Sequence, residues 1–148
     1  MDRRDFIKNS CVACISGTTF VSLLSSCHAT KYSSGKLEPN GISVSKEEFI
    51  HKKNNKKEYH SYIIVRNEKL QYPICIYRLT ENEYTALWMR CTHQGTELQV
   101  AGDRLQCPAH GSEFTNHGLV SNGPAAKNLR SFPVTISENK IYLDLRAV

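Results

Sequence analysis

The chain has 148 residues, of which 40% are hydrophobic and 22% charged, and its formal net charge is +5. This length accommodates one domain of ordinary size after a leader, and the composition is that of a globular rather than a disordered protein. The positive charge is modest and dispersed along the chain, so we expect no nucleic-acid partner.

The first 27 residues have the features of an export signal. Arg3 and Arg4, with the four residues that follow them, resemble the twin-arginine export motif. A mildly apolar stretch over 11–24 follows, and it is too short and interrupted for a full membrane span, which needs about 20 apolar residues. Residues 24–27 resemble a bacterial lipoprotein cleavage box. We therefore expect residues 1–27 to be a twin-arginine-type signal with lipidation at Cys27. The alternative is that Cys27 is an ordinary leader residue.

Residues 28–41 contain Ser, Gly and Lys without apolar periodicity, which predicts a flexible tether. From residue 42 to residue 148 the pattern indicates one β domain. Its segments rich in β-branched and aromatic residues are 59–66, 72–79, 84–90, 132–136 and 141–145. Short strands with polar turns between them predict an all-β sandwich or barrel with antiparallel strands.

Local motifs add detail to this domain. Residues 45–48 have a capping-box pattern that predicts one helical turn. Residues 101–103 can turn a hairpin with arms 97–100 and 104–106. Cys75, in an apolar run, predicts a buried and inert thiol.

Two groups of polar residues are interpreted as ordinary surface. A basic run predicts a solvated loop, with contact to an acidic redox partner or to anionic lipid headgroups as the alternative; it consists of Lys52, Lys53, Lys56 and Lys57. Nothing in the spacing of the remaining histidines predicts a second metal site, so we expect surface or structural roles for His51, His60 and His117.

Two short loops each contain one cysteine and one histidine. Cys91 precedes His93 by two residues, and after thirteen further residues Cys107 precedes His110 by three. Zinc fingers usually pair two cysteines in a knuckle with two histidines on a helix. Two mixed half-sites instead suit a binuclear centre to which each loop contributes ligands for both metal atoms. The resemblance is to the Rieske iron–sulfur family, in which two histidines replace two cysteines on one iron of a 2Fe–2S cluster. The accompanying residues in matching places are Thr92, Gly95, Pro108, Gly111 and Ser112.

This resemblance implies a ligand set and a cofactor. Cys91 and Cys107 would hold one iron of a single 2Fe–2S cluster, and His93 and His110 would hold the other. Neutral imidazoles leave the oxidised core without net charge, so an added electron is opposed less than in an all-cysteine cluster. Rieske centres accordingly have potentials of roughly −150 to +300 mV, against about −400 mV for plant-type ferredoxins.

Residues around the ligands place this chain within that range. Ser112 is at the position where many relatives of higher potential have a serine that hydrogen-bonds a bridging sulfide. Phe114 replaces a tyrosine that is often the second donor. Thr96 and Ala109 replace two cysteines that form a disulfide between the loops. We therefore expect an intermediate potential.

The resemblance also predicts where the cluster lies in the fold. The two ligand loops would lie at one end of a small cluster-binding subdomain. Residues 123–125 resemble the proline-containing loop that covers the cluster from a third side.

The function expected from the resemblance is one-electron transfer, by an electron-transfer protein or subunit rather than a self-contained enzyme. We expect an exported, membrane-tethered subunit of a respiratory or oxidase system. Its redox partners would be a cytochrome b-type subunit, a cytochrome c or a molybdoenzyme. Export by a route that moves folded proteins agrees with a cluster inserted in the cytoplasm. The alternatives are a ferredoxin component of a Rieske oxygenase system, which would be cytoplasmic, and a structural zinc-binding module, which would be colourless.

Overall fold

The computed structural model describes residues 30–53 and 55–146. The predicted signal, including Cys27, lies outside the described residues. The described part of the chain is β structure apart from one 3₁₀ turn, η1 (Lys46–Phe49), which confirms the all-β prediction. No described helix is long and apolar enough to cross a membrane. The strands are β1 (Tyr32–Ser33), β2 (Lys36–Glu38), β3 (Gly41–Ser45), β4 (Ile50–Lys53), β5 (Lys56–Tyr59), β6 (Tyr62–Val65), β7 (Ile74–Arg78), β8 (Tyr84–Trp88), β9 (Gln99–Ala101), β10 (Arg104–Gln106), β11 (Glu113–Thr115), β12 (Val120–Asn122), β13 (Ser131–Phe132), β14 (Val134–Ile136) and β15 (Lys140–Asp144).

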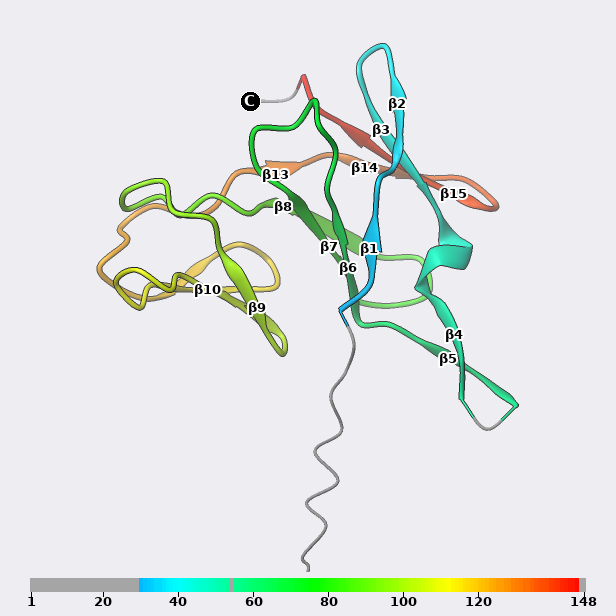
Figure 1. The fold of residues 1–148 in the computed structure, drawn as a ribbon, viewed down its shortest axis with the longest axis horizontal. Coiled ribbons are helices and arrows are strands. Elements are labelled where there is room, and N and C mark those ends of the chain that lie inside the picture. The colour runs from blue at the N-terminus through cyan, green and yellow to red at the C-terminus, as the bar shows by residue number, and fades with distance from the viewer. Residues whose placement is uncertain (1–29, 54, 147–148) are drawn as a thin grey trace, which may run out of the picture.

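The strands form three larger sheets and one separate hairpin. A five-stranded sheet has the order β1-β6-β7-β8-β13, and a four-stranded sheet has the order β14-β15-β3-β2. A second four-stranded sheet, β12-β11-β10-β9, forms a lobe of its own at one end of the molecule (Figure 1). The remaining strands, β4 and β5, pair only with each other. The lobe is the small subdomain that the resemblance predicts.

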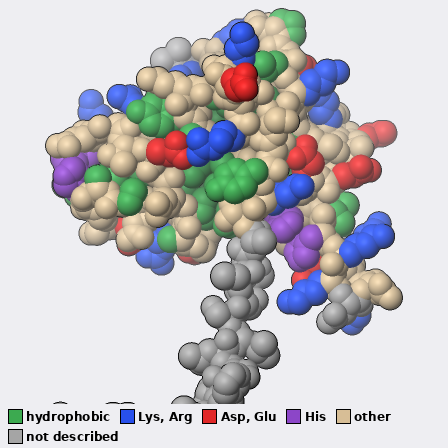
Figure 2. Space-filling model, viewed as in Figure 1, with side chains coloured by type: hydrophobic (Ala, Val, Ile, Leu, Met, Phe, Trp, Pro, Cys, Tyr) green, Lys and Arg blue, Asp and Glu red, His purple; other side chains and the backbone are tan. Residues whose placement is uncertain are grey.

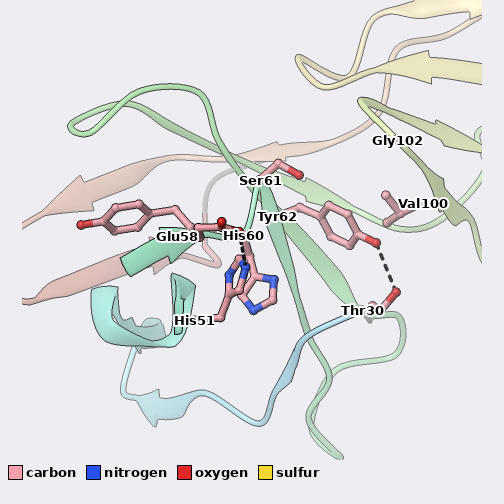
Figure 3. A pocket seen from close by; sticks show the side chains of 9 residues that line it. Thr30, His51, Glu58, His60, Ser61, Tyr62, Val100 and Gly102 are labelled. Carbon is pink, nitrogen blue, oxygen red and sulfur yellow. Dashed lines mark hydrogen bonds and ion pairs between the residues drawn. The ribbon is translucent and has the colours of Figure 1, made fainter. Parts of the chain in front are cut away.

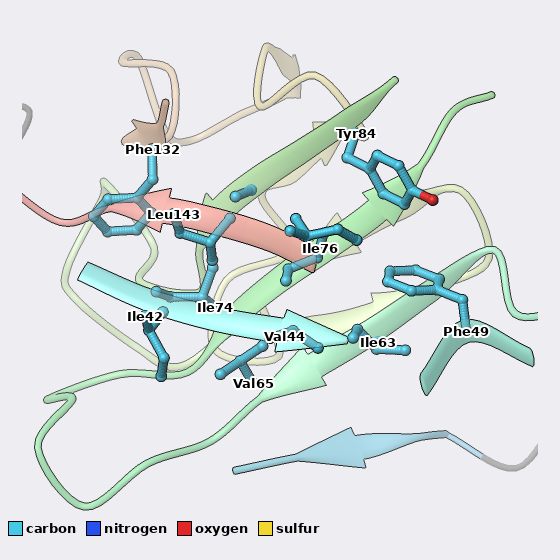
Figure 4. Packing of buried hydrophobic residues seen from close by; sticks show 12 residues of the cluster. Ile42, Val44, Phe49, Ile63, Val65, Ile74, Ile76, Tyr84, Phe132 and Leu143 are labelled. Carbon is cyan, nitrogen blue, oxygen red and sulfur yellow. The ribbon is translucent and has the colours of Figure 1, made fainter. Parts of the chain in front are cut away.

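The five-stranded sheet is buried on both faces. Ile63 and Ile76 are cross-strand partners, and their side chains pack against Ile42 and Leu143 of the β14-β15-β3-β2 sheet (Figure 4). Ile64 and Cys75, the next pair along the same two strands, belong to the core on the opposite face. Because successive side chains alternate between faces, burial of both faces requires uninterrupted apolar runs in β6 and β7.

The second core joins the five-stranded sheet to the lobe. Leu87 and Met89, from β8 and the residues after it, pack with Leu98, Leu105 and Phe114 of the lobe. The thiol of Cys75 is fully buried there, and this burial raises its pKa far above the ordinary value. The prediction of a buried thiol at Cys75 is therefore confirmed. Cys91 and Cys107 belong to the same core.

The local motifs are also found. Ser45 caps η1, and its hydroxyl accepts a hydrogen bond of 3.2 Å from the backbone N–H of Glu47. Strands β9 and β10 form the predicted hairpin, with Ala101 opposite Arg104. Gly102 in the turn has φ +67, a left-handed conformation that glycine adopts without steric cost.

The predicted tether needs correction where it is described. β1 pairs in parallel with β6, and β2 pairs antiparallel to β3, so residues 32–38 belong to the folded domain rather than to a flexible linker. Backbone pairing holds these short strands at the edges of their sheets. Tyr32 and Leu37 remain exposed, and Ser33 is buried. Without a buried apolar face, the segment has no periodicity from which a strand could be predicted.

The basic run also differs from the prediction of a loop. Its four lysines lie on the paired strands β4 and β5, with Lys52 opposite Lys57 and Lys53 opposite Lys56. All four are exposed. This hairpin projects from the body of the molecule, and blue side chains gather on it at the lower right of Figure 2.

Candidate metal centre

The two ligand loops contain the same pair of internal backbone hydrogen bonds. We call residues 91–96 the first knuckle and residues 107–112 the second knuckle. In each, the N–H of the cysteine donates to the carbonyl five residues later, and the N–H four residues later donates back to the carbonyl of the cysteine. These bonds join Cys91 N to Thr96 O (2.8 Å), Gly95 N to Cys91 O (2.8 Å), Cys107 N to Ser112 O (2.8 Å) and Gly111 N to Cys107 O (3.0 Å).

Both knuckles need a glycine at the fourth position after the cysteine. Gly95 has φ +77 and Gly111 has φ +76, so both lie in the left-handed region that disfavours other residues. At Gly95 a side chain would also meet Arg90, whose Nε lies 3.3 Å from the position of a Cβ. The glycines of the motif are therefore explained by the turn of each knuckle.

The cysteines and the histidines of the knuckles differ in solvent exposure. Cys91 and Cys107 are each 1% exposed, whereas His93 and His110 are exposed. The two imidazole rings face each other edge to face, with centroids 5.1 Å apart and an interplanar angle of 87°. The Cys91 side chain also lies within hydrogen-bonding reach of Cys107. The structure thus brings the four predicted ligands together as two pairs, one of buried sulfurs and one of exposed imidazoles, and not as a group of three or four side chains around a single atom.

The second knuckle favours the thiolate form of its cysteine. Burial raises the pKa of Cys107, but hydrogen bonds from the backbone N–H groups of Ala109 and His110 and from the side chains of Cys91 and Thr96 outweigh burial and lower it. A cysteine binds metal as the thiolate. This donor set therefore fits a metal cluster.

Ser112 connects the second knuckle to residues 122–127, which we call the third loop. Its side chain is fully buried, and its hydroxyl oxygen accepts a hydrogen bond of 3.0 Å from the N–H of Ala125. The hydroxyl hydrogen therefore remains available as a donor, and no acceptor for it is recorded among residues 30–53 and 55–146. A buried hydroxyl with a proton to donate suits a sulfide, which accepts hydrogen bonds. Residues 123–125 thus lie against the second knuckle, as the resemblance predicts.

Two further hydrogen bonds fasten the third loop. The hydroxyl of Thr92, in the first knuckle, donates to the carbonyl of Lys127 at 2.6 Å. The side-chain amide of Asn122 donates to the carbonyl of Gly111 at 3.2 Å. The loop is therefore bound to both knuckles. Neither Asn122 nor Lys127 is predicted from the sequence, because one acts through an isolated amide and the other through its backbone.

A separate cavity of about 590 Å³ lies at the base of the β4–β5 hairpin (Figure 3). His51 and His60 stack there with ring centroids 4.4 Å apart, and His51 Nε2 lies 3.2 Å from Glu58 Oε2. Within the described ranges, no three His, Cys, Asp or Glu side chains are grouped closely enough to hold one metal ion. The stacked pair fastens the hairpin base, in agreement with the structural role expected for these histidines.

Residues 25–133 match the family model of the Rieske [2Fe-2S] domain. The chain belongs to this family. A Rieske domain binds a single 2Fe–2S cluster and transfers electrons. Family membership therefore decides against the zinc-binding module that the sequence left open.

Three curated relatives show how widely this Rieske domain is shared. The cytochrome b6-f complex iron–sulfur subunit of Chlorobaculum tepidum is 33% identical over 63 residues, which are 41% of this chain and 35% of that protein. The chloroplastic subunit of the same name from Bigelowiella natans is 32% identical over 119 residues, or 74% and 43% of the two chains. The methylxanthine N1-demethylase NdmA of Pseudomonas putida is 42% identical over 50 residues, or 32% and 14%. The matches span less than half of each of these relatives.

A solved structure agrees with the assignment. The plasma membrane Rieske protein PetC3 of the cyanobacterium Synechocystis PCC 6803 is similar with a TM-score of 0.50 and 25% sequence identity. The similarity covers 57% of this chain and 86% of that one. The relatives thus include both cytochrome b6-f complex subunits and a demethylase, so the family alone does not assign the system in which this Rieske domain works.

Proposed function

We propose that this Rieske domain is an exported one-electron carrier whose cluster ligands are Cys91, Cys107, His93 and His110. The observation that carries the assignment is the pairing of buried thiols beneath facing, exposed imidazoles. The two cysteines would hold one iron and the two histidines the other. When bound, the cluster supplies reversible one-electron oxidation and reduction.

In this proposal, the protein residues around the cluster have three roles. The second core keeps water away from the sulfurs, because Cys91 and Cys107 are packed among apolar side chains. The knuckles hold His93 and His110 at the surface, where a partner can approach them within electron-transfer distance. Each histidine has two ring nitrogens, so one of them would remain available to hydrogen-bond a partner when the other holds iron.

The proposed location is the outer face of the cytoplasmic membrane, with an acyl chain on Cys27. The twin-arginine motif, the cleavage box and the need to export a folded protein with its cluster support this location. The two relatives that are cytochrome b6-f subunits support a role beside a membrane complex. The donor would be quinol at a cytochrome b-type subunit or the metal centre of a molybdoenzyme, and the acceptor a c-type haem.

A ferredoxin component of an oxygenase system is the second candidate. The similarity to a methylxanthine demethylase, and to the oxygenase component of dicamba O-demethylase from Stenotrophomonas maltophilia, favours it. Such a carrier would work in the cytoplasm, so location separates the two candidates.

Cell fractionation with mass spectrometry of the mature N-terminus tests the proposal. We expect an acylated Cys27 at the N-terminus of a membrane-bound protein, and release of the protein from the membrane by Cys27→Ala. A soluble cytoplasmic protein with an intact leader would instead establish the ferredoxin alternative.

The ligand assignment is tested by iron and acid-labile sulfide analysis of the purified protein. His93→Ala and His110→Ala should each lose the reduced-state paramagnetic signal of the cluster. His117→Ala is the matched control, because His117 is exposed and lies outside both knuckles. Retention of a normal signal in the His93 or His110 variant would remove that residue from the ligand set.

A further inference from the structure

We propose that the β4–β5 hairpin is a basic surface by which the domain binds the anionic surface of a lipid membrane. This inference rests on the membrane location proposed above, and it assigns to the domain a defined orientation there. The contact residues are Lys52, Lys53, Lys56 and Lys57. Their partners would be phosphate groups of anionic phospholipids.

The first observation is that positive charge is concentrated on this hairpin. Residues 52–57 contain four lysines and neither aspartate nor glutamate. The register places Lys52 opposite Lys57 and Lys53 opposite Lys56, on an isolated two-stranded ribbon. Like charges directly opposite each other destabilise a strand pair, and a lone hairpin is only marginally stable. A local conflict of this kind is expected where a binding partner supplies the missing opposite charge.

The second observation is that contacts fix the base of the hairpin, whereas none of the four lysines has an ion-pair partner among the described residues. Glu58, the nearest acid, is paired with His51 and lies at the base. The guanidinium of Arg78 lies over the ring of Tyr59, 4.4 Å from its centroid. These contacts hold the ribbon in its projecting position, so the four exposed lysines are presented as a group.

The third observation concerns where the described chain begins. Thr30 lines the same cavity as His51, Glu58 and Tyr59 at the hairpin base. Lys31 is already fixed by the sheet, because its carbonyl accepts a 2.9 Å hydrogen bond from the N–H of Ile64. Cys27 precedes Thr30 by three residues, which can reach at most about 11 Å. An acyl anchor at Cys27 would therefore bring the hairpin side of the domain close to the membrane.

The fourth observation favours a lipid surface over a redox protein as the binding partner of the hairpin. The lobe of β9–β12 and the β4–β5 hairpin project on opposite sides of the molecule (Figure 1), and only the β9–β10 end of the lobe, with Val100 and Gly102, lines the cavity at the hairpin base. A redox partner that contacted only the hairpin lysines would therefore not contact the knuckles, where the electron would leave the domain. A membrane surface has no such requirement. Contact there would leave the imidazole edge free for a partner beside the membrane.

Vesicle binding of the purified holoprotein tests this inference. The variant carries Lys53→Gln and Lys56→Gln, and the matched control carries Lys36→Gln and Lys69→Gln. The control removes two exposed positive charges away from the hairpin: Lys36 lies on β2, and Lys69 lies in the β6–β7 loop, whose Asn67 hydrogen-bonds the carbonyl of Ser34 beside β2. Each protein is partitioned onto vesicles of phosphatidylglycerol and phosphatidylcholine, and onto vesicles of phosphatidylcholine alone. An acyl anchor contributes equally in every comparison.

We expect the hairpin variant to bind the anionic vesicles about 25-fold more weakly than the unmodified protein, since each lysine near such a surface contributes about five-fold. The control should lose far less, and the difference should disappear at high salt because surface charge is then screened. Equal losses in the two variants, or no preference for the anionic vesicles, would overturn the inference. Unchanged vesicle binding with slower electron transfer to an acidic protein would assign the hairpin to a protein partner instead.

The outcome is separable from that of the proposed function. The absorption spectrum of the cluster and the acylation state of Cys27 are recorded on the same preparations. A lipidated, red-brown protein whose vesicle binding does not depend on the hairpin lysines would refute the membrane contact of the hairpin alone. An unlipidated cytoplasmic protein would refute the proposed location, whatever its affinity for vesicles.

Discussion

The backbone N–H of Ala125 donates a 3.0 Å hydrogen bond to the hydroxyl of Ser112, from a loop thirteen residues further along the chain. This bond occupies the oxygen of Ser112 as an acceptor and thereby fixes the direction in which its proton can be donated. The third loop therefore does more than cover the knuckles. It occupies an acceptor position of the one buried hydroxyl of the second knuckle and leaves its proton to be donated elsewhere.

Replacing Ser112 by alanine should keep the cluster but lower its reduction potential. A hydrogen bond to a charged acceptor contributes about 1.5 to 3 kcal/mol, which corresponds to roughly 60 to 130 mV for one electron. Protein-film voltammetry measures the change. Ser43→Ala is the control, because Ser43 is also buried but lies on β3 in the other core region. An unchanged potential in Ser112→Ala would show that the hydroxyl does not donate to the cluster.

The hydroxyl of Thr96 should also affect the reduction potential of the cluster. Its hydroxyl reaches the sulfur of Cys107 and helps to lower the pKa of that thiol, although burial and the two backbone donors have larger effects. Thr96→Val keeps the shape and removes the donor, so the potential should fall by less than in Ser112→Ala. Thr135→Val, at an exposed position on β14, is the control in the same voltammetric experiment. A fall as large as that caused by Ser112→Ala would contradict this order.

Much of the fold was predictable because two physical patterns are local. The β-branched and aromatic runs at 59–66 and 72–79 predict strands, and β6 and β7 lie within them as apolar stretches buried on both faces. The predicted tether failed at β1 and β2 for the opposite reason. Those strands are held by backbone hydrogen bonds at sheet edges, and Tyr32 and Leu37 are left exposed. Such pairing leaves no pattern in the side chains.

The proposed ligand residues stand out in the sequence because metal chemistry demands particular side chains at fixed spacing. Cys91 and His93 are defined by what they can bind, and Gly95 by the turn between them. The fastening of the third loop could not be predicted, since the partners are the backbone groups of Ala125 and Lys127. The stacking of His51 on His60 follows from the register of β4 and β5, which spacing alone does not reveal. The intermediate potential and the role of Cys27 stay predictions.

Stability should depend on pH through Asp144. Hydrogen bonds from the side chain and the backbone N–H of Arg146 lower the pKa of the Asp144 carboxyl to about 2. A carboxyl whose pKa is lower in the folded state stabilises that state above its ordinary pKa, and this contribution is lost as the pH falls from 3.8 toward 2. Asp144→Asn should therefore lower the midpoint of thermal unfolding at pH 7 but not at pH 2.

The matched control for this pH dependence is Asp103→Asn, because the Asp103 side chain is 83% exposed and only loosely paired with Arg104. It should leave the midpoint nearly unchanged at both pH values. An Asp144→Asn variant that is as stable as the unmodified protein at pH 7 would mean that the contact with Arg146 contributes nothing to folding. Circular dichroism at the two pH values is sufficient to decide.

The pairing of β3 with β15 depends on the absence of a side chain at Gly41. A Cβ there would lie 2.1 Å from the carbonyl oxygen of Leu143 and 2.7 Å from the ring of Tyr142. The carbonyl belongs to a paired strand and cannot move aside without breaking the ladder, so Gly41→Ala should destabilise the protein by about 3 kcal/mol. At about 3 to 4 °C per kcal/mol for a chain of this size, the midpoint of thermal unfolding should fall by roughly 10 °C.

Gly102→Ala distinguishes this steric effect from the general loss of a glycine. A Cβ at Gly102 would meet nothing within 4 Å, so only its positive φ opposes alanine, at a cost of about 1 kcal/mol. The Gly41 variant should therefore unfold at a clearly lower temperature than the Gly102 variant. Equal midpoints would show that β15 can shift away from β3.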